Sequence, residues 1–192
     1  SPGDNCIFYA PAVELANDII SSPYLDNRVS CAVLIDVLRS LKTLQYDAYF
    51  VFTTQEEVGL RGAKAAAFGI MPDLGIAIDV TGTGDIINPA HIMSVKLGAG
   101  PTVKIKDASV ICSPMVRRLL EQTAEKHQIP YQPEILEYGG TDTASIQLTG
   151  AGIPAGCISI PTRYIHSMSE TCSMSDVENA ARLLTALLEE GA

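Results

Sequence analysis

The sequence lacks long apolar runs, clusters of basic residues and paired cysteine motifs. No apolar run approaches the roughly 20 residues of a membrane-spanning helix. The first 15 residues have neither the basic nor the apolar stretch of a secretion signal. The 13 lysines and arginines are outnumbered by 22 acidic residues and are scattered, which argues against nucleic acid and anionic membranes as partners. These absences predict a globular, cytoplasmic protein.

The cysteines are five in number, scattered, and without a CxxC pair, so they indicate neither a zinc–cysteine site nor a redox motif. Most lie among apolar residues and are predicted to be small core residues. The 192 residues are 47% hydrophobic, which is enough apolar material for one good core. We therefore expect residues 1–192 to form a single domain.

Strand and helix patterns alternate along the chain. Apolar and β-branched runs predict strands, and apolar residues spaced three and four apart predict helices. Strands are expected at residues 46–54, 74–80, 93–97, 102–105, 131–136 and 153–160, and helices at 27–44, 60–68, 113–127 and 143–148, with a last helix capped by Ser175. This alternation predicts an α/β fold with a mostly parallel central sheet flanked by helices.

Four candidate metal ligands fall at comparable places in this pattern. Asp26 precedes a helix, Glu57 and Asp79 follow strands, and His166 lies in the loop after a third strand. The carboxyl ends of neighbouring parallel strands share one edge of a sheet, so these side chains can converge. Imidazole and carboxylate ligands suit zinc or a similar divalent ion.

Glu56 stands next to a candidate ligand and is given a different role. Two ions about 3.5 to 4 Å apart, bridged by one carboxylate, would hold a hydroxide and polarise an amide carbonyl. Glu56 would then be the general base that takes the proton from water and passes it to the leaving amine.

Each of these residues also has an ordinary interpretation. Glu56 and Glu57 could be a solvated surface pair, Asp26 a helix N-cap, and His166 a loop residue. The two glutamates also raise glycoside hydrolysis as an alternative. However, adjacent residues on an extended backbone point in opposite directions, whereas glycosidase carboxylates flank one bond. Only the joint pattern favours a metal site.

Four segments, and the combination of EEVGLRGA with PTRYIHS above all, resemble the co-catalytic metallo-aminopeptidases of family M42, which include glutamyl aminopeptidases, tetrahedral aminopeptidases and FrvX-like proteins. The segments are YLDNRVSCAVLIDVL, FTTQEEVGLRGAKAAAFGIMPDLGIAIDV, YGGTDTASIQLTGAGIP and ISIPTRYIHSMSE. The resemblance implies a zinc-peptidase (phosphorylase/hydrolase-like) architecture and removal of N-terminal residues from short peptides. It also implies two divalent ions, for which zinc, cobalt and manganese are all acceptable.

The resemblance assigns the same roles to the same residues. Asp26 is implied to bridge the two ions, Glu57 and His166 to bind one of them, and Asp79 to bind the other. Glu56 is implied to be the proton acceptor.

The resemblance also implies a substrate wall and an assembly. The loop of Gly139, Gly140, Thr141 and Asp142 resembles the segment that borders the first side chain of the substrate, and Arg163 lies in the same wall. Family members assemble into tetrahedral dodecamers, so a homo-oligomer is expected.

One departure from the family pattern is plain in the sequence. The family resembled has a further histidine ligand in an N-terminal HxDE segment, followed by an inserted β-domain, and neither is found in these 192 residues. We therefore expect residues 1–192 to be the C-terminal part of a catalytic domain. A catalytically inactive fragment, or a structural or interaction module of the same fold, is the alternative.

Overall fold

The computed structural model describes residues 1–89 and 92–190. In order along the chain, the strands are β1 (Val13–Leu15), β2 (Ile19–Ser21), β3 (Gly75–Thr81), β4 (Thr102–Lys106), β5 (Gln132–Ile135), β6 (Ala155–Arg163) and β7 (Thr171–Ser173). The helices are α1 (Leu25–Ser40), α2 (Arg61–Ile70), α3 (Pro114–Lys126), α4 (Asp142–Gln147) and α5 (Met174–Glu190).

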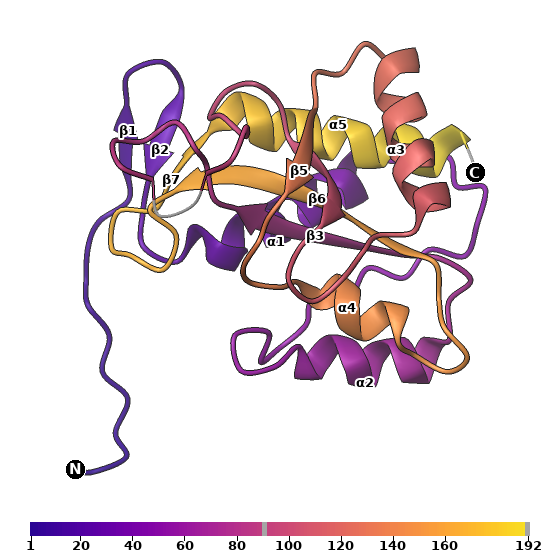
Figure 1. Cartoon of the computed structure of the whole chain (residues 1–192), viewed down its shortest axis with the longest axis horizontal. Coiled ribbons are helices and arrows are strands. Elements are labelled where there is room, and N and C mark those ends of the chain that lie inside the picture. The colour runs from indigo at the N-terminus through magenta and orange to yellow at the C-terminus, as the bar shows by residue number, and fades with distance from the viewer. Residues whose placement is uncertain (90–91, 191–192) are drawn as a thin grey trace.

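The strands form one sheet around the long strand β6 (Figure 1). Its order is β1-β2-β7-β6-β4-β5, with β3 paired to β6 beside this path. The β3–β6 and β4–β5 pairs are parallel, and the other pairs are antiparallel, so the sheet is mixed. The register places Asp79 of β3 beside Ser159 of β6.

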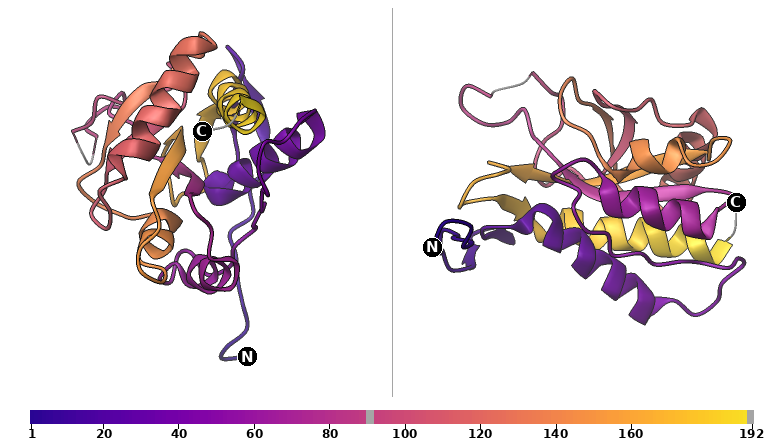
Figure 2. Two further views of the ribbon diagram at one scale, coloured as in Figure 1. Left: turned by 90° about the vertical axis from the view of Figure 1, so that its right-hand side faces the viewer. Right: turned by 90° about the horizontal axis from the view of Figure 1, so that it is seen from below.

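Helices cover both faces of the sheet. Figure 2 shows α1, α3 and α5 on one side of it and α2 with α4 on the other. The main apolar core lies under α1, α3 and α5; its fully buried members include Val37, Leu120, Ile158 and Leu183. Within residues 1–89 and 92–190, no helix combines the length and the apolar character needed to cross a membrane.

Strand β6 separates an apolar side from a polar one. Successive strand residues point to opposite faces, and Ile158 and Ile160 belong to the apolar core. Ser159 therefore faces the α2–α4 side, and it is fully buried. Lys104 and Glu134 are also almost completely buried and bonded to each other. The sheet thus carries buried polar groups beside the strand that holds Asp79.

The predicted α/β fold with flanking helices is confirmed, but two predicted strands are absent. Residues 46–54 form neither helix nor strand, and neither do residues 93–97. Tyr49 and Phe52 are 67% and 48% exposed. A strand needs a partner for its N–H and C=O groups, and no strand of the described chain pairs with either segment. Local β propensity alone was therefore insufficient to predict whether these two segments form strands.

The last helix also differs from its prediction. Helix α5 begins at Met174, so Ser175 lies inside it and does not cap it. The loop expected to carry His166 is followed by a strand, β7, which pairs with β2 and β6. Helix α3 lies within its predicted range of 113–127, with Ser113 at the N-cap position and Pro114 in the first turn.

Candidate functional site

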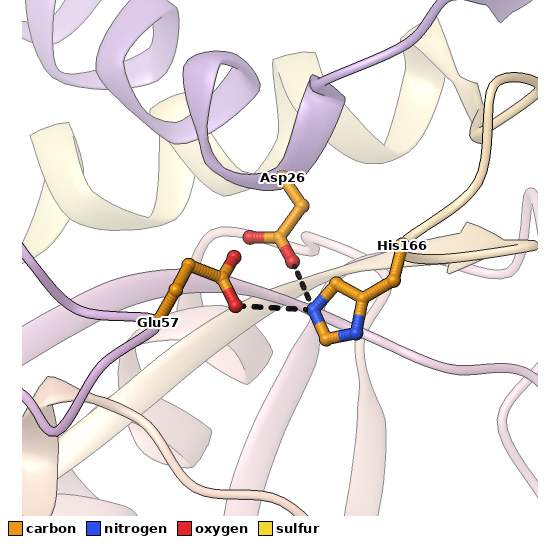
Figure 3. A group of neighbouring side chains, drawn as sticks. All are labelled: Asp26, Glu57 and His166. Atoms are coloured by element: carbon orange, nitrogen blue, oxygen red, sulfur yellow. Dashed lines mark ion pairs between the residues drawn. The ribbon is translucent and has the colours of Figure 1, made fainter. Parts of the chain in front are cut away.

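Asp26, Glu57 and His166 meet at one end of the sheet (Figure 3). His166 Nε2 lies 3.1 Å from Asp26 Oδ2 and 3.3 Å from Glu57 Oε2. One potential ligand atom from each residue lies within 4.8 Å of the other two. The three side chains come from the start of α1, the turn before α2 and the loop after β6, so only the folded chain brings them together.

Glu170 holds two of these residues in place through their backbones. One carboxylate oxygen accepts the N–H of Asp26 at 2.9 Å, and the other accepts the N–H of His166 at 2.8 Å. Glu170 is only 3% exposed, and His166 has a left-handed backbone, with φ of 63°. Glu170 is not among the residues predicted from the sequence, although it lies four residues after His166 in the segment ISIPTRYIHSMSE.

Asp26 is 10% exposed at its side chain and lies next to a second carboxylate. Burial and the charge of Glu57 raise the pKa of Asp26 to about 6, although His166 opposes the increase. Among the described residues, no lysine or arginine forms an ion pair with these two carboxylates. A group of this kind is suited to a bound cation.

The turn over residues 55–60 presents both adjacent glutamates. The N–H of Leu60 donates to the C=O of Glu56 at 2.9 Å, which closes the turn before α2. Gly62 then lies against the backbone of Thr54, where a Cβ atom would come within 2.5 Å of the Thr54 nitrogen and oxygen. The start of α2 can approach the preceding segment this closely because residue 62 has no side chain.

Glu56 lies beside this cluster without joining it. Burial, followed by the charges of Glu57 and Asp142, raises the pKa of Glu56 to about 7. Its side chain is half-buried. Glu56 is therefore a carboxylate next to the ligand cluster and close to the loop that precedes α4.

Asp79 is also outside the three-residue cluster. It is 6% exposed on β3, and its Oδ1 accepts the N–H of Val80 at 2.8 Å. Burial raises the pKa of Asp79 well above its usual range; the Val80 N–H opposes this, and the charges of Glu56 and Asp26 add to it. Asp79 is thus an electrostatic neighbour of the cluster at a more buried position.

The loop before α4 begins with two glycines. Gly139 has a φ of 70°, which favours glycine. A Cβ atom on Gly140 would lie 2.6 Å from Ser109 Oγ, so the loop packs closely on the turn that follows β4.

The next two residues connect this loop to the glutamate turn. Thr141 is buried, and its hydroxyl donates to Thr143 Oγ1 at 2.9 Å. Asp142 accepts a hydrogen bond from Thr53 Oγ1 at 2.6 Å. Burial raises the pKa of Asp142, and the Thr53 hydroxyl opposes that increase. The contact between Thr53 and Asp142 fixes α4 relative to the segment that leads to Glu56.

Arg163 forms a two-pronged ion pair with Asp85. Its Nε and Nη2 atoms lie 3.1 and 2.8 Å from the two Asp85 oxygens. Partial burial raises the pKa of Asp85, but the hydrogen bond from Arg163 outweighs it, and the pKa is lowered to about 2. The guanidinium therefore anchors the loop after β3 through a partner that no sequence pattern predicts.

The donor set fits a divalent metal ion. Two carboxylates and one imidazole nitrogen are ligand types that zinc accepts, and they lie close enough to share one ion. The family profile of the M42 glutamyl aminopeptidases matches residues 1–183. The chain belongs to the M42 family.

Relatives agree with this M42 assignment. A protein of Acetivibrio thermocellus that bears an aminopeptidase name is 57% identical over 95% of this chain and 54% of its own length. A solved aminopeptidase of Desulfurococcus kamchatkensis is 41% identical, with a TM-score of 0.90 over 94% of this chain and 52% of its own. The TET1 peptidase of Pyrococcus horikoshii, reported to assemble into a tetrahedron or a large octahedral shell, is 33% identical. Its TM-score is 0.85, and the match covers 96% of this chain and 54% of its own. The M42 chain described here spans about half the length of these relatives.

The site residues predicted for this M42 chain fall into two groups. Asp26, Glu57 and His166 are in direct contact, with Glu56 and Asp79 as electrostatic neighbours. Four of the predicted wall residues lie in the segment that packs on Thr53 and Ser109: Gly139, Gly140, Thr141 and Asp142. The fifth, Arg163, forms an ion pair with Asp85.

Proposed function

We propose that this chain carries the ligand and proton-transfer residues of a metal-dependent aminopeptidase. Asp26, Glu57, Asp79 and His166 would hold two divalent ions, and Glu56 would be the general base. The observation that carries the proposal is the position of His166 Nε2, within 3.3 Å of carboxylate oxygens from both Asp26 and Glu57.

The chemistry divides between the ions and the chain. When bound, divalent ions would supply Lewis acidity toward the peptide carbonyl and would activate the attacking water. Glu56 accepts the proton of the attacking water and donates it to the nitrogen of the leaving amine.

The proposed substrate wall is the loop before α4 together with the end of β6. Its fixed position relative to Thr53 supports this role, because the same contact fixes the approach to Glu56. The residues proposed to border the first side chain of the substrate are Gly139, Gly140, Thr141, Asp142 and Arg163.

The ions and the assembly follow from the ligand types and from the relatives. Zinc, cobalt and manganese all accept carboxylate and imidazole ligands. The assembly of the Pyrococcus horikoshii peptidase into shells supports a homo-oligomer, with short peptides as substrates.

The test combines elemental analysis with release of p-nitroaniline from aminoacyl p-nitroanilides, with and without added Zn²⁺ or Co²⁺. We expect metal-dependent turnover. Glu56→Gln should lower kcat about 10²- to 10⁴-fold while the bound metal is retained. A variant with full turnover would remove Glu56 from the mechanism.

Two other functions make different predictions in the same assay. The chain spans about half the length of its relatives, which makes an inactive structural or interaction module the second candidate. That module would show neither metal-dependent turnover nor two bound ions. A glycosidase would instead cleave a glycan in the presence of a chelator.

A further inference from the structure

A groove of about 670 Å³ runs between α2 and α4. In Figure 1 these helices lie side by side below the sheet. The groove has both basic and apolar walls. Its lining includes Arg61, Lys64 and Phe68 from α2, and Ala144, Ser145 and Leu148 from α4.

The groove lies between two helices that both start beside the candidate active site. Helix α2 starts immediately after the turn that carries Glu56, and α4 starts at Asp142, which is hydrogen-bonded to Thr53. At the other end, Met71 lies against Gly150, where a Cβ atom would be 2.5 Å from the Met71 Cε. The two helices therefore run in the same direction, away from the glutamates, and the groove lies between them.

The groove beyond the site carries two cations. The site end carries the carboxylates of Glu56 and Glu57, whereas the groove carries Arg61 and Lys64. Neither cation forms an ion pair with a carboxylate of the described chain, and Arg61 has only a 3.4 Å contact with the amide oxygen of Gln55. A short peptide has a C-terminal carboxylate, which is complementary to these two cations.

The spacing of the cations matches short peptides. Lys64 is three residues after Arg61, so it lies about 4.5 Å further along the helix axis. Each additional residue of an extended peptide adds about 3.3 to 3.6 Å. A peptide one residue longer would thus move its carboxylate by about the distance between the two cations.

We propose that the groove between α2 and α4 binds the C-terminal part of a short peptide, with Arg61 and then Lys64 facing its carboxylate. Phe68 and Leu148, which are 72% and 80% exposed, offer apolar contacts to its side chains. This inference rests on the proposed aminopeptidase function. It specifies the preferred substrate as a short peptide with a free C-terminal carboxylate.

The binding test uses trialanine and trialanine amide with metal-free protein, followed by NMR. We expect resonance shifts in α2 and α4, and an affinity for trialanine about three- to tenfold higher than for the amide. In Arg61→Gln/Lys64→Gln, the affinities for trialanine and trialanine amide should become equal. Arg39→Gln/Lys42→Gln, which removes the same charge from the end of α1, should keep the difference. Equal affinities in the unmodified chain, or shifts that avoid α2 and α4, would overturn the proposal.

The kinetic test separates the groove from the proposed activity. The ratio of KM for trialanine amide to KM for trialanine should be about three to ten and should fall toward one in Arg61→Gln/Lys64→Gln. Added salt should reduce the ratio as well, because it screens exposed charges. Turnover with a KM ratio of one would refute carboxylate binding in the groove and leave the proposed aminopeptidase activity standing. Binding of trialanine at α2 and α4 without any turnover would refute the aminopeptidase and leave the groove.

Discussion

A buried ion cluster beside the candidate site gives the strongest stability prediction. Lys104 of β4 and Glu134 of β5 are paired, with both side chains fully buried. Lys104 Nζ also lies 3.5 Å from Asp107 Oδ2. Glu134 accepts further hydrogen bonds from the hydroxyls of Thr81, at 2.9 Å, and Thr102, at 2.5 Å. Lys104 thus pairs with two buried carboxylates. Glu134 in turn connects it to Thr81, at the end of the strand that holds Asp79.

The perturbation is Lys104→Met, which keeps the chain length and removes the charge. Burial lowers the pKa of Lys104, but the charge of Glu134 outweighs it, so the pKa is raised. A raised lysine pKa contributes stability that is fully present below its unfolded value of about 10.4, so pH 7 is suitable for the measurement. Removing one partner of a buried pair costs about 3 to 5 kcal/mol, out of a total stability of about 5 to 15 kcal/mol.

The assay is urea unfolding followed by circular dichroism. Lys104→Met should lower the free energy of unfolding by about 3 to 5 kcal/mol, and adding Glu134→Gln should restore more than half of that loss. The matched control is Lys126→Met, which breaks the exposed pair with Glu190 at 2.8 Å. That change should cost about 0 to 1 kcal/mol. The reasoning is refuted if Lys104→Met costs no more than this control, or if the double variant is no more stable than the single one.

Two further predictions concern contacts that hold the site. Glu170→Gln replaces a carboxylate that accepts the N–H groups of both Asp26 and His166; because an outer-shell partner orients its ligands, affinity for Zn²⁺, measured by titration calorimetry, should fall about 10- to 100-fold. Asp85→Asn removes the ion pair with Arg163, and it should cost about 1 to 2 kcal/mol at pH 7 after allowance for partial exposure. The pKa of Asp85 is lowered from 3.8 to about 2, so this difference in unfolding free energy should be constant above about pH 4 and should disappear as the pH falls toward 2.

Each of these variants has an informative control. Glu178→Gln changes an exposed glutamate of α5 in the same way as Glu170→Gln, and it should leave Zn²⁺ affinity unchanged. An equal loss in both variants would remove Glu170 from the support of the site. For Asp85→Asn, a stability difference that persists undiminished at pH 2 would contradict the ion-pair explanation.

The observed strands show where the local sequence was sufficient to predict a strand. The apolar run that became β3 and the run that became most of β6 were predicted nearly to their observed bounds, because both strands are largely buried and mostly apolar. Residues 46–54 have an equally strong local pattern but no pairing strand in the described chain. Pairing is a property of the neighbours, so composition cannot predict it.

In the candidate site, too, some features could be predicted from the sequence and others were decided by the tertiary structure. The residue types and their places after strands or before helices were sufficient to nominate Asp26, Glu56, Glu57, Asp79 and His166. The tertiary structure decided that three of them touch and that Asp79 is more deeply buried.

The sequence by itself therefore determined the fold class and the family and nominated the candidate site residues, because these depend on side-chain type and local spacing. Only the tertiary structure decided how the candidate ligands are held. Glu170, which supports two of them, and Asp85, which engages Arg163, act across turns and strands whose closeness in space leaves no periodic pattern in the sequence.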